Sequence, residues 1–136
     1  MDFKILGIEH IGLAQNKQNS ELSLFLENIL NLNKKSEIVE NQKVLTEIFD
    51  TGSGKIELLS PTHTNSVLTK FLSKKGQSAH HLAILVDDLD KALEYLKSKS
   101  VRLINEKPEI GADNMKIAFI HPHSTPGLLL EFCQKA

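Results

Sequence analysis

The sequence is poor in the residues that mark several classes of protein. It has one cysteine, no tryptophan and a single arginine among its 136 residues. One cysteine, Cys133, cannot form an intrachain disulfide, so nothing points to an oxidising compartment. No apolar run reaches membrane-spanning length, and the first residues do not open a secretory signal. We therefore expect a soluble, cytoplasmic protein with no membrane partner.

The chain also lacks an excess of charge of either sign. Sixteen basic and seventeen acidic residues give a formal net charge of −1. A nucleic-acid-binding protein should show a basic excess, so no nucleic-acid partner is expected. The hydrophobic fraction of 40% and the charged fraction of 24% are those of an ordinary globular protein. A length of 136 residues fits one domain.

Apolar residues recur with strand or helix periodicity along the whole chain. Strands are predicted at residues 5–14, 36–40, 43–50, 55–60, 79–86, 101–105, 116–120 and 128–134. The first strand is apolar on both faces, which predicts that both are covered. Helices are predicted to begin after Asn19 or Ser20, after Ser66, and after Asp87 or Asp88, because these residue types cap helices. Residues 106–114 and 121–127 are predicted loops.

This order of elements is an internal repeat within an α+β fold. Each half is predicted to read βαβββ, and neither half alone is large enough to bury a good core. Module one covers about residues 5–60 and module two about 79–134, with a connector at about 61–78 that contains a short helix. We expect the two modules to form a single domain over 1–136.

A histidine and a glutamate occupy matching places in the two halves. His10 precedes Glu57 by 47 residues, and His81 precedes Glu131 by 50. Each histidine lies early in a short apolar strand, and each glutamate lies in the apolar strand that closes its half. A lone histidine in such a strand is usually a hydrogen-bonded core residue. The repetition at equivalent positions instead predicts a shared role.

Two glutamates in apolar strands need partners, because a buried unpaired carboxylate costs several kcal/mol. A salt bridge to Lys55 or Lys116 is one solution, and a metal ion is the better one. Two histidines and two carboxylates suit Co²⁺, Mn²⁺, Ni²⁺, Zn²⁺ or Fe²⁺ rather than a closed structural zinc site, which prefers cysteine. If the sheets curl, the four side chains can point into one cavity.

Several segments, in order along nearly the whole chain, resemble the vicinal-oxygen-chelate superfamily and, within it, the methylmalonyl-CoA epimerases. They are Glu9–Gly12, Gln42–Val44, Ile56–Pro61, Lys70–Gly76, His80–Ala83, Val86–Asp88, Gly111–Ala112, Ala118–Pro122 and Leu130–Glu131. The resemblance implies paired βαβββ modules forming a cupped, mostly antiparallel sheet around a metal cavity. It implies one divalent ion held by His10, Glu57, His81 and Glu131.

The resemblance also implies a reaction, the epimerisation of (2R)- and (2S)-methylmalonyl-CoA, with an acyl-CoA as partner. The C2 proton lies between a thioester and a carboxylate, so a dication can stabilise the charge left when the proton departs. Inversion needs a base on one side and an acid on the other. Glu131 is the first candidate and Glu47 the second. Some relatives carry a glutamate where this chain has Thr46, and alternation leaves open which of Thr46 and Glu47 faces the cavity.

Other functions stay open from the sequence. His123 stands where relatives usually carry lysine, and Gly111–Asn114 lacks their second glycine, so the substrate mouth departs from the family pattern. The alternatives are a glyoxalase I-type (lactoylglutathione lyase) isomerase using the same four ligands, and a small-molecule binding protein without turnover. The oligomeric state is undetermined, with a homodimer as one candidate.

Overall fold

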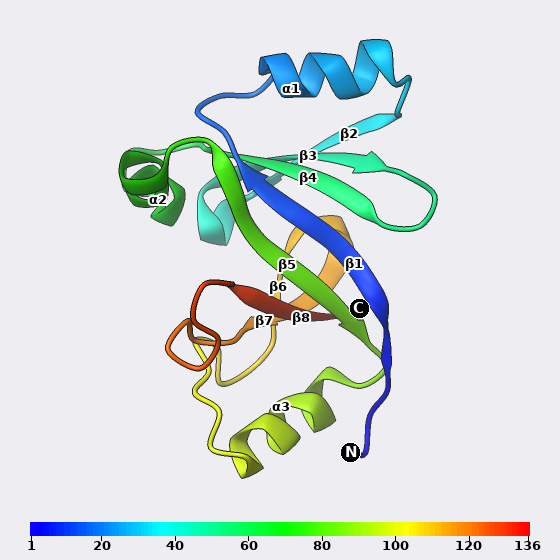
Figure 1. The fold of residues 1–136 in the computed structure, drawn as a ribbon, viewed down its shortest axis with the longest axis vertical. Coiled ribbons are helices and arrows are strands. Elements are labelled where there is room, and N and C mark those ends of the chain that lie inside the picture. The colour runs from blue at the N-terminus through cyan, green and yellow to red at the C-terminus, as the bar shows by residue number, and fades with distance from the viewer. The chain divides into compact units, whose positions relative to one another are not determined.

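A computed structural model describes all residues, 1–136, and divides them into two compact units. The N-terminal unit comprises His10–His80, and the C-terminal unit comprises Met1–Glu9 together with His81–Ala136. The first strand, β1 (Ile5–Ala14), and the fifth, β5 (Ser78–Val86), each contribute residues to both units (Figure 1). The first nine residues therefore belong structurally with the second half of the chain.

The N-terminal unit has a four-stranded mixed sheet in the order β2-β3-β4-β1. Its β2/β3 and β3/β4 pairs are antiparallel, and its β4/β1 pair is parallel. The strands β2 (Lys34–Val39), β3 (Val44–Asp50) and β4 (Lys55–Pro61) follow the helical segment α1 (Glu21–Leu24) and η1 (Phe25–Ile29). A short turn, η2 (Glu40–Gln42), joins β2 to β3, and α2 (Val67–Lys75) follows β4.

The C-terminal unit repeats the pattern with its sheet ordered β5-β8-β7-β6. The β5/β8 pair is parallel and the other pairs are antiparallel. Its elements after β5 are α3 (Leu89–Ser98), β6 (Glu109–Ile110), η3 (Ala112–Asn114), β7 (Met115–Phe119) and β8 (Leu130–Lys135). None of the helices in either unit is long and apolar enough to cross a membrane.

Strand alternation gives each sheet a face that packs on a helix. In the N-terminal unit, Phe49 and Leu58 pack with Leu26 of η1, whereas Val44 and Leu59, on the other face, pack with Leu68 of α2. In the C-terminal unit, α3 covers a core on one face: Leu89, Ala92, Leu93, Ala118 and Phe132. The other face carries a separate cluster: Ala83, Met115, Ile117 and Cys133. Each sheet thus has two different faces: the N-terminal sheet packs on η1 on one face and on α2 on the other, and the C-terminal sheet packs on α3 on one face only.

The predicted α+β fold with two βαβββ modules is confirmed. Most elements also begin and end near their predicted bounds. Ser20, Ser66 and Asp88 are the N-caps of α1, α2 and α3, and each side chain accepts a backbone N–H of its helix. Gly76 ends α2 with φ +69°, a conformation that glycine adopts without steric cost.

The predicted strand at 101–105 is wrong. This segment makes a single bridge, between Leu103 and Ile120, and its apolar residues pack on the α3 core instead of extending the sheet. The strand at that place in the module is β6, two residues inside the predicted loop 106–114, where Glu109 pairs with Ile117. Apolar character alone did not distinguish residues buried by packing from residues paired in a ladder.

Two further expectations are corrected. The helix after Ser20 widens at residue 25 into a π-helix, in which the Leu30 amide donates to the Phe25 carbonyl at 3.1 Å. The first half of β1 is not covered on both faces, since Ile5, Leu6 and Ile8 are 55%, 57% and 61% exposed. The prediction that both faces of this strand are covered therefore does not hold for its first half, although both faces carry apolar residues.

Truncating the α3 core should destabilise the protein. Leu89 is fully buried, so Leu89→Ala should lower the free energy of unfolding by about 2–5 kcal/mol, through lost transfer energy and the cavity left behind. Val67→Ala is the matched control, because Val67 is 71% exposed, and it should change stability by less than about 0.5 kcal/mol. Urea denaturation followed by circular dichroism measures both. Equal effects would contradict the assignment of Leu89 to the core.

Candidate metal centre

In the N-terminal unit, β1 and β4 bring a histidine and a glutamate together. The His10 Nδ1 lies 3.3 Å from the Glu57 Oε2, and both side chains are about 5% exposed. In the parallel ladder Gly12 lies directly alongside Glu57, and His10 alongside Lys55, so these residues share one face of the sheet. This is the face away from η1.

The C-terminal unit makes the equivalent pair with β5 and β8. The His81 Nε2 lies 3.6 Å from the Glu131 Oε1, and these side chains are also about 5% exposed. Ala83 lies alongside Glu131 in the ladder, and the Phe119 ring meets the His81 ring edge to face at 5.5 Å. This pair lies on the face of its sheet away from α3.

Both pairs are longer than a strong hydrogen bond, and the 3.3 Å pair falls within the range for two ligands of one ion while the 3.6 Å pair lies just above it. A charge-assisted N–H···O contact is usually about 2.7–2.9 Å long. Ligand atoms bound about 2.1 Å from a metal lie roughly 3.0–3.5 Å from one another in octahedral or tetrahedral geometry. The donor types, imidazole nitrogen and carboxylate oxygen, are those that Zn²⁺, Mn²⁺, Co²⁺ and Ni²⁺ accept. Each unit therefore holds one histidine–glutamate pair of metal-ligating residue types, and binding of one ion by the two pairs stays a prediction.

The structure places Glu47 in a hydrogen-bond network on the helix side of the N-terminal sheet. Gln15 Nε2 donates to its Oε1 at 2.6 Å, and Ser23 Oγ donates to its Oε2 at 2.9 Å. The Asn19 amide approaches both oxygens, and Lys34 Nζ lies 3.5 Å from Oε2. Glu47 is 1% exposed, so these partners together hold a buried carboxylate.

The strand register settles which residue of β3 shares the face of Glu57. Ile48 pairs directly with Glu57, and Thr46 pairs with Leu59, so Thr46 and Ile48 lie on the Glu57 face. Glu47 pairs with Leu58 and lies on the opposite face. Glu47 therefore does not share a face with Glu57, and its part as an acid–base residue stays a prediction that this register does not support. Its contacts tie the β1–α1 segment to the sheet.

Gln15 and Ser23 were not predicted to be functional. Ser23 is the one buried residue of α1, and Gln15, directly after β1, is 4% exposed. A buried polar side chain needs a hydrogen-bond partner. If the burial of Gln15 and Ser23 had been known, a carboxylate that accepts from both could have been sought. The sequence did not show the burial of either residue.

His80 packs against α2 in the N-terminal unit. It lies next to His81 in the chain but packs its ring edge to face on Phe71 of α2, at 4.8 Å between centroids. Burial lowers the pKa of His80 below its ordinary value, because a charged imidazole is disfavoured away from water.

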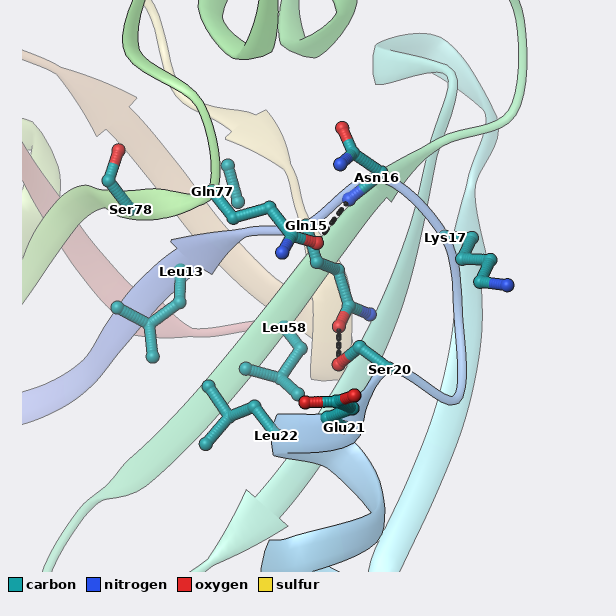
Figure 2. Close-up of a pocket in the computed structure, with 11 residues that line it drawn as sticks. Leu13, Gln15, Asn16, Lys17, Ser20, Glu21, Leu22, Leu58, Gln77 and Ser78 are labelled. Atoms are coloured by element: carbon teal, nitrogen blue, oxygen red, sulfur yellow. Dashed lines mark hydrogen bonds between the residues drawn. The ribbon is translucent and has the colours of Figure 1, made fainter.

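A pocket of about 660 Å³ lies in the N-terminal unit, between the β1–α1 segment and the start of β5. Figure 2 shows Leu13 and Leu58 at its apolar base, with Gln77 accepting the Asn16 amide at 2.9 Å and Ser20 donating to Gln15 at 2.6 Å. Leu13 and Leu58 pair in the ladder on the helix side of the sheet. The pocket is therefore separate from the His10–Glu57 pair.

Replacing Glu47 should affect stability more than chemistry. Glu47→Gln puts an amide N–H₂ among groups that donate and removes the charge facing Lys34, so the free energy of unfolding should fall by about 1–3 kcal/mol. Metal content and turnover of the folded variant should stay close to those of the parent. Exposed Glu40, replaced by glutamine, is the control. Parent-like denaturation curves with strongly reduced turnover would return Glu47 to the chemistry.

The chain is similar in sequence and fold to several known proteins. An uncharacterized protein of Bacillus subtilis, YqjC, is 42% identical over 128 residues, which cover 93% of this chain and 91% of that protein. The crystal structure of methylmalonyl-CoA epimerase from Mycobacterium tuberculosis superposes with a TM-score of 0.90 at 30% identity, over 97% of this chain and 89% of that one. A methylmalonyl-CoA epimerase in complex with methylmalonyl-CoA and NH4+ has a TM-score of 0.89 at 27% identity, over 98% and 96%.

Residues 9–119 match the family described as the glyoxalase/bleomycin resistance protein/dioxygenase superfamily. The match spans most of both βαβββ modules, including three of the four residues of the His–Glu pairs. The chain therefore belongs to the glyoxalase/bleomycin resistance protein/dioxygenase superfamily.

Proposed function

We propose that this protein is a metal-dependent epimerase of methylmalonyl-CoA. The observation that supports it most is the repeated His–Glu pair, buried on the face away from η1 in one sheet and away from α3 in the other, in a chain that matches methylmalonyl-CoA epimerases over almost its whole length. In this proposal the two pairs bind one divalent ion together. Two carboxylates and two neutral imidazoles would balance the charge of a dication.

The reaction begins with loss of the proton at C2 of the acyl group. The C–H electron pair moves toward the thioester carbonyl, and the proton returns to the other face of the carbon. A bound divalent ion would act as a Lewis acid toward the thioester and carboxylate oxygens of the substrate. Because the pairs are buried among apolar side chains, water is largely excluded, which strengthens electrostatic interactions at the reacting carbon.

Each residue has an assigned role in the proposal. His10, Glu57 and His81 hold the ion and thereby orient the substrate. Glu131 holds it as well, and one of its oxygens takes or returns the C2 proton on one face. Phe119, which packs against His81, fixes the orientation of that imidazole. Glu47 has no part in the chemistry, because it lies on the other face of its sheet.

Metal content tests the site itself. The purified parent should hold one divalent ion per chain by elemental analysis and lose it to a chelator. His10→Ala and Glu57→Ala should each weaken metal binding by more than the 10–100-fold that loss of an outer-sphere partner usually costs. His63→Ala is the control, because His63 is exposed and belongs to neither pair. Parent-like affinity in both ligand variants would show that the site is elsewhere.

Turnover tests the reaction. In an assay coupled to a stereospecific mutase, the metal-loaded parent should convert one epimer of methylmalonyl-CoA into the other, and the chelated protein should not. No activity there, with rapid turnover of the methylglyoxal–glutathione adduct, would establish the glyoxalase-type reaction instead. Tight binding of the CoA ester without any turnover would identify a binding protein.

A further inference from the structure

Epimerisation through a carbanion-like intermediate needs a proton-transfer group on each face of the reacting carbon. The proposed function supplies one, Glu131, and the structure removes Glu47 as the other. A hydroxyl such as that of Thr46 is a poor base at neutral pH. One place to look for the second group is the face of the N-terminal sheet that carries Glu57.

Few carboxylates in the strands of the N-terminal unit meet that condition. Besides Glu57, the strands β2, β3 and β4 place only Glu37 and Asp50 on the Glu57 face, because Glu37 pairs with Thr46 and Asp50 pairs with Lys55. Asp50 is exposed at the hairpin, where its Oδ1 accepts the Gly52 amide at 2.8 Å. Glu37 is half-buried on β2 and lies directly across the ladder from the fully buried Thr46.

The spacing suits a group that reaches a substrate rather than the ion. Glu37 on β2 pairs with Thr46 on β3, and Glu57 on β4 pairs with Ile48, two residues farther along β3. Glu37 and Glu57 are therefore separated by two strand spacings and by two residues along the strand direction. With strands about 4.8 Å apart and residues about 3.4 Å apart, their Cα atoms are separated by about 12 Å along the sheet. That span places Glu37 farther from Glu57 than two ligands of one ion usually lie, so in this proposal its carboxylate acts on a substrate and does not bind the ion.

We propose that Glu37 is the second acid–base residue of the epimerase, a role that rests on the function proposed above. Its carboxylate takes the C2 proton from one epimer while the C–H electron pair moves to the thioester carbonyl. Protonated Glu131 then delivers a proton to the opposite face of C2, and the two residues exchange roles in the reverse direction. The carboxylate is thus supplied by strand β2, next to the Thr46 position of β3.

Hydrogen exchange at C2 tests this with a stereochemical readout. Each epimer of methylmalonyl-CoA is incubated in D₂O with the metal-loaded full chain, and loss of the C2 proton is followed by proton NMR. In Glu37→Gln, exchange from one epimer should fall about 10²–10⁴-fold, the usual worth of general acid–base help, while exchange from the other falls much less. Metal content by elemental analysis should equal that of the parent.

Two further variants separate a chemical role from a structural one. Glu40→Gln removes an exposed carboxylate three residues along the chain and should leave both exchange rates unchanged. Thr46→Glu in the Glu37→Gln background returns a carboxylate to the same face, directly across the ladder, and should restore at least part of the lost exchange. If Glu37→Gln does not fold, Glu37→Thr removes the same carboxylate with a residue that favours strands.

The outcomes distinguish the two proposals. A parent that binds metal but exchanges neither epimer overturns the proposed epimerase and the role of Glu37 with it. If the parent is active and Glu37→Gln keeps the exchange rates of the parent, the role of Glu37 alone is overturned. The same holds if Glu37→Gln loses metal and its exchange rates fall equally for both epimers. An asymmetric fall with unchanged metal content and rescue by Thr46→Glu supports Glu37 as a catalytic residue.

Discussion

The burial of two carboxylates constrains this protein more than any other feature. Glu57 and Glu131 are 4% and 3% exposed in strands whose neighbours are mostly apolar. An isolated carboxylate in such a place would cost several kcal/mol or take up a proton. Each is met within its own unit by a histidine from the adjacent parallel strand. The parallel β1/β4 and β5/β8 pairs are therefore what brings a histidine and a glutamate together in each half of the repeated fold.

Alternation along the strands separates structural from chemical polar groups. In the N-terminal unit, one face of β3 and β4 packs on η1 and includes Glu47, whose partners are Gln15, Ser23 and Lys34. The other face carries His10 and Glu57. Both carboxylates are buried to the same degree, yet one is satisfied by donors from a neighbouring segment and the other faces an imidazole. Burial alone cannot distinguish these roles, whereas the face and the partner can.

The sequence predicted the fold and the histidine–glutamate pairs because both repeat. Because the chain contains two similar halves, each half could be compared with the other, and His10 could be matched to His81. The choice between Thr46 and Glu47 could not be made in the same way. A one-residue shift of register exchanges the faces of a strand, and β3 is apolar on both. Only the pairing of Ile48 with Glu57 decides it. The short β6 was missed for a related reason, since two residues are too few to show alternation.

The duplication repeats more than the ligands. Two residues after each histidine stands a small residue, Gly12 in β1 and Ala83 in β5, and each lies directly alongside the glutamate of its pair. In a parallel ladder such neighbours point to the same face, so a larger side chain there would fill the space beside the carboxylate. Close packing would be the cheaper arrangement if these glutamates were only structural, because an apolar side chain alongside would bury more surface. The chain instead keeps small residues at both positions, which agrees with the function proposed above, in which each of these carboxylates binds an ion.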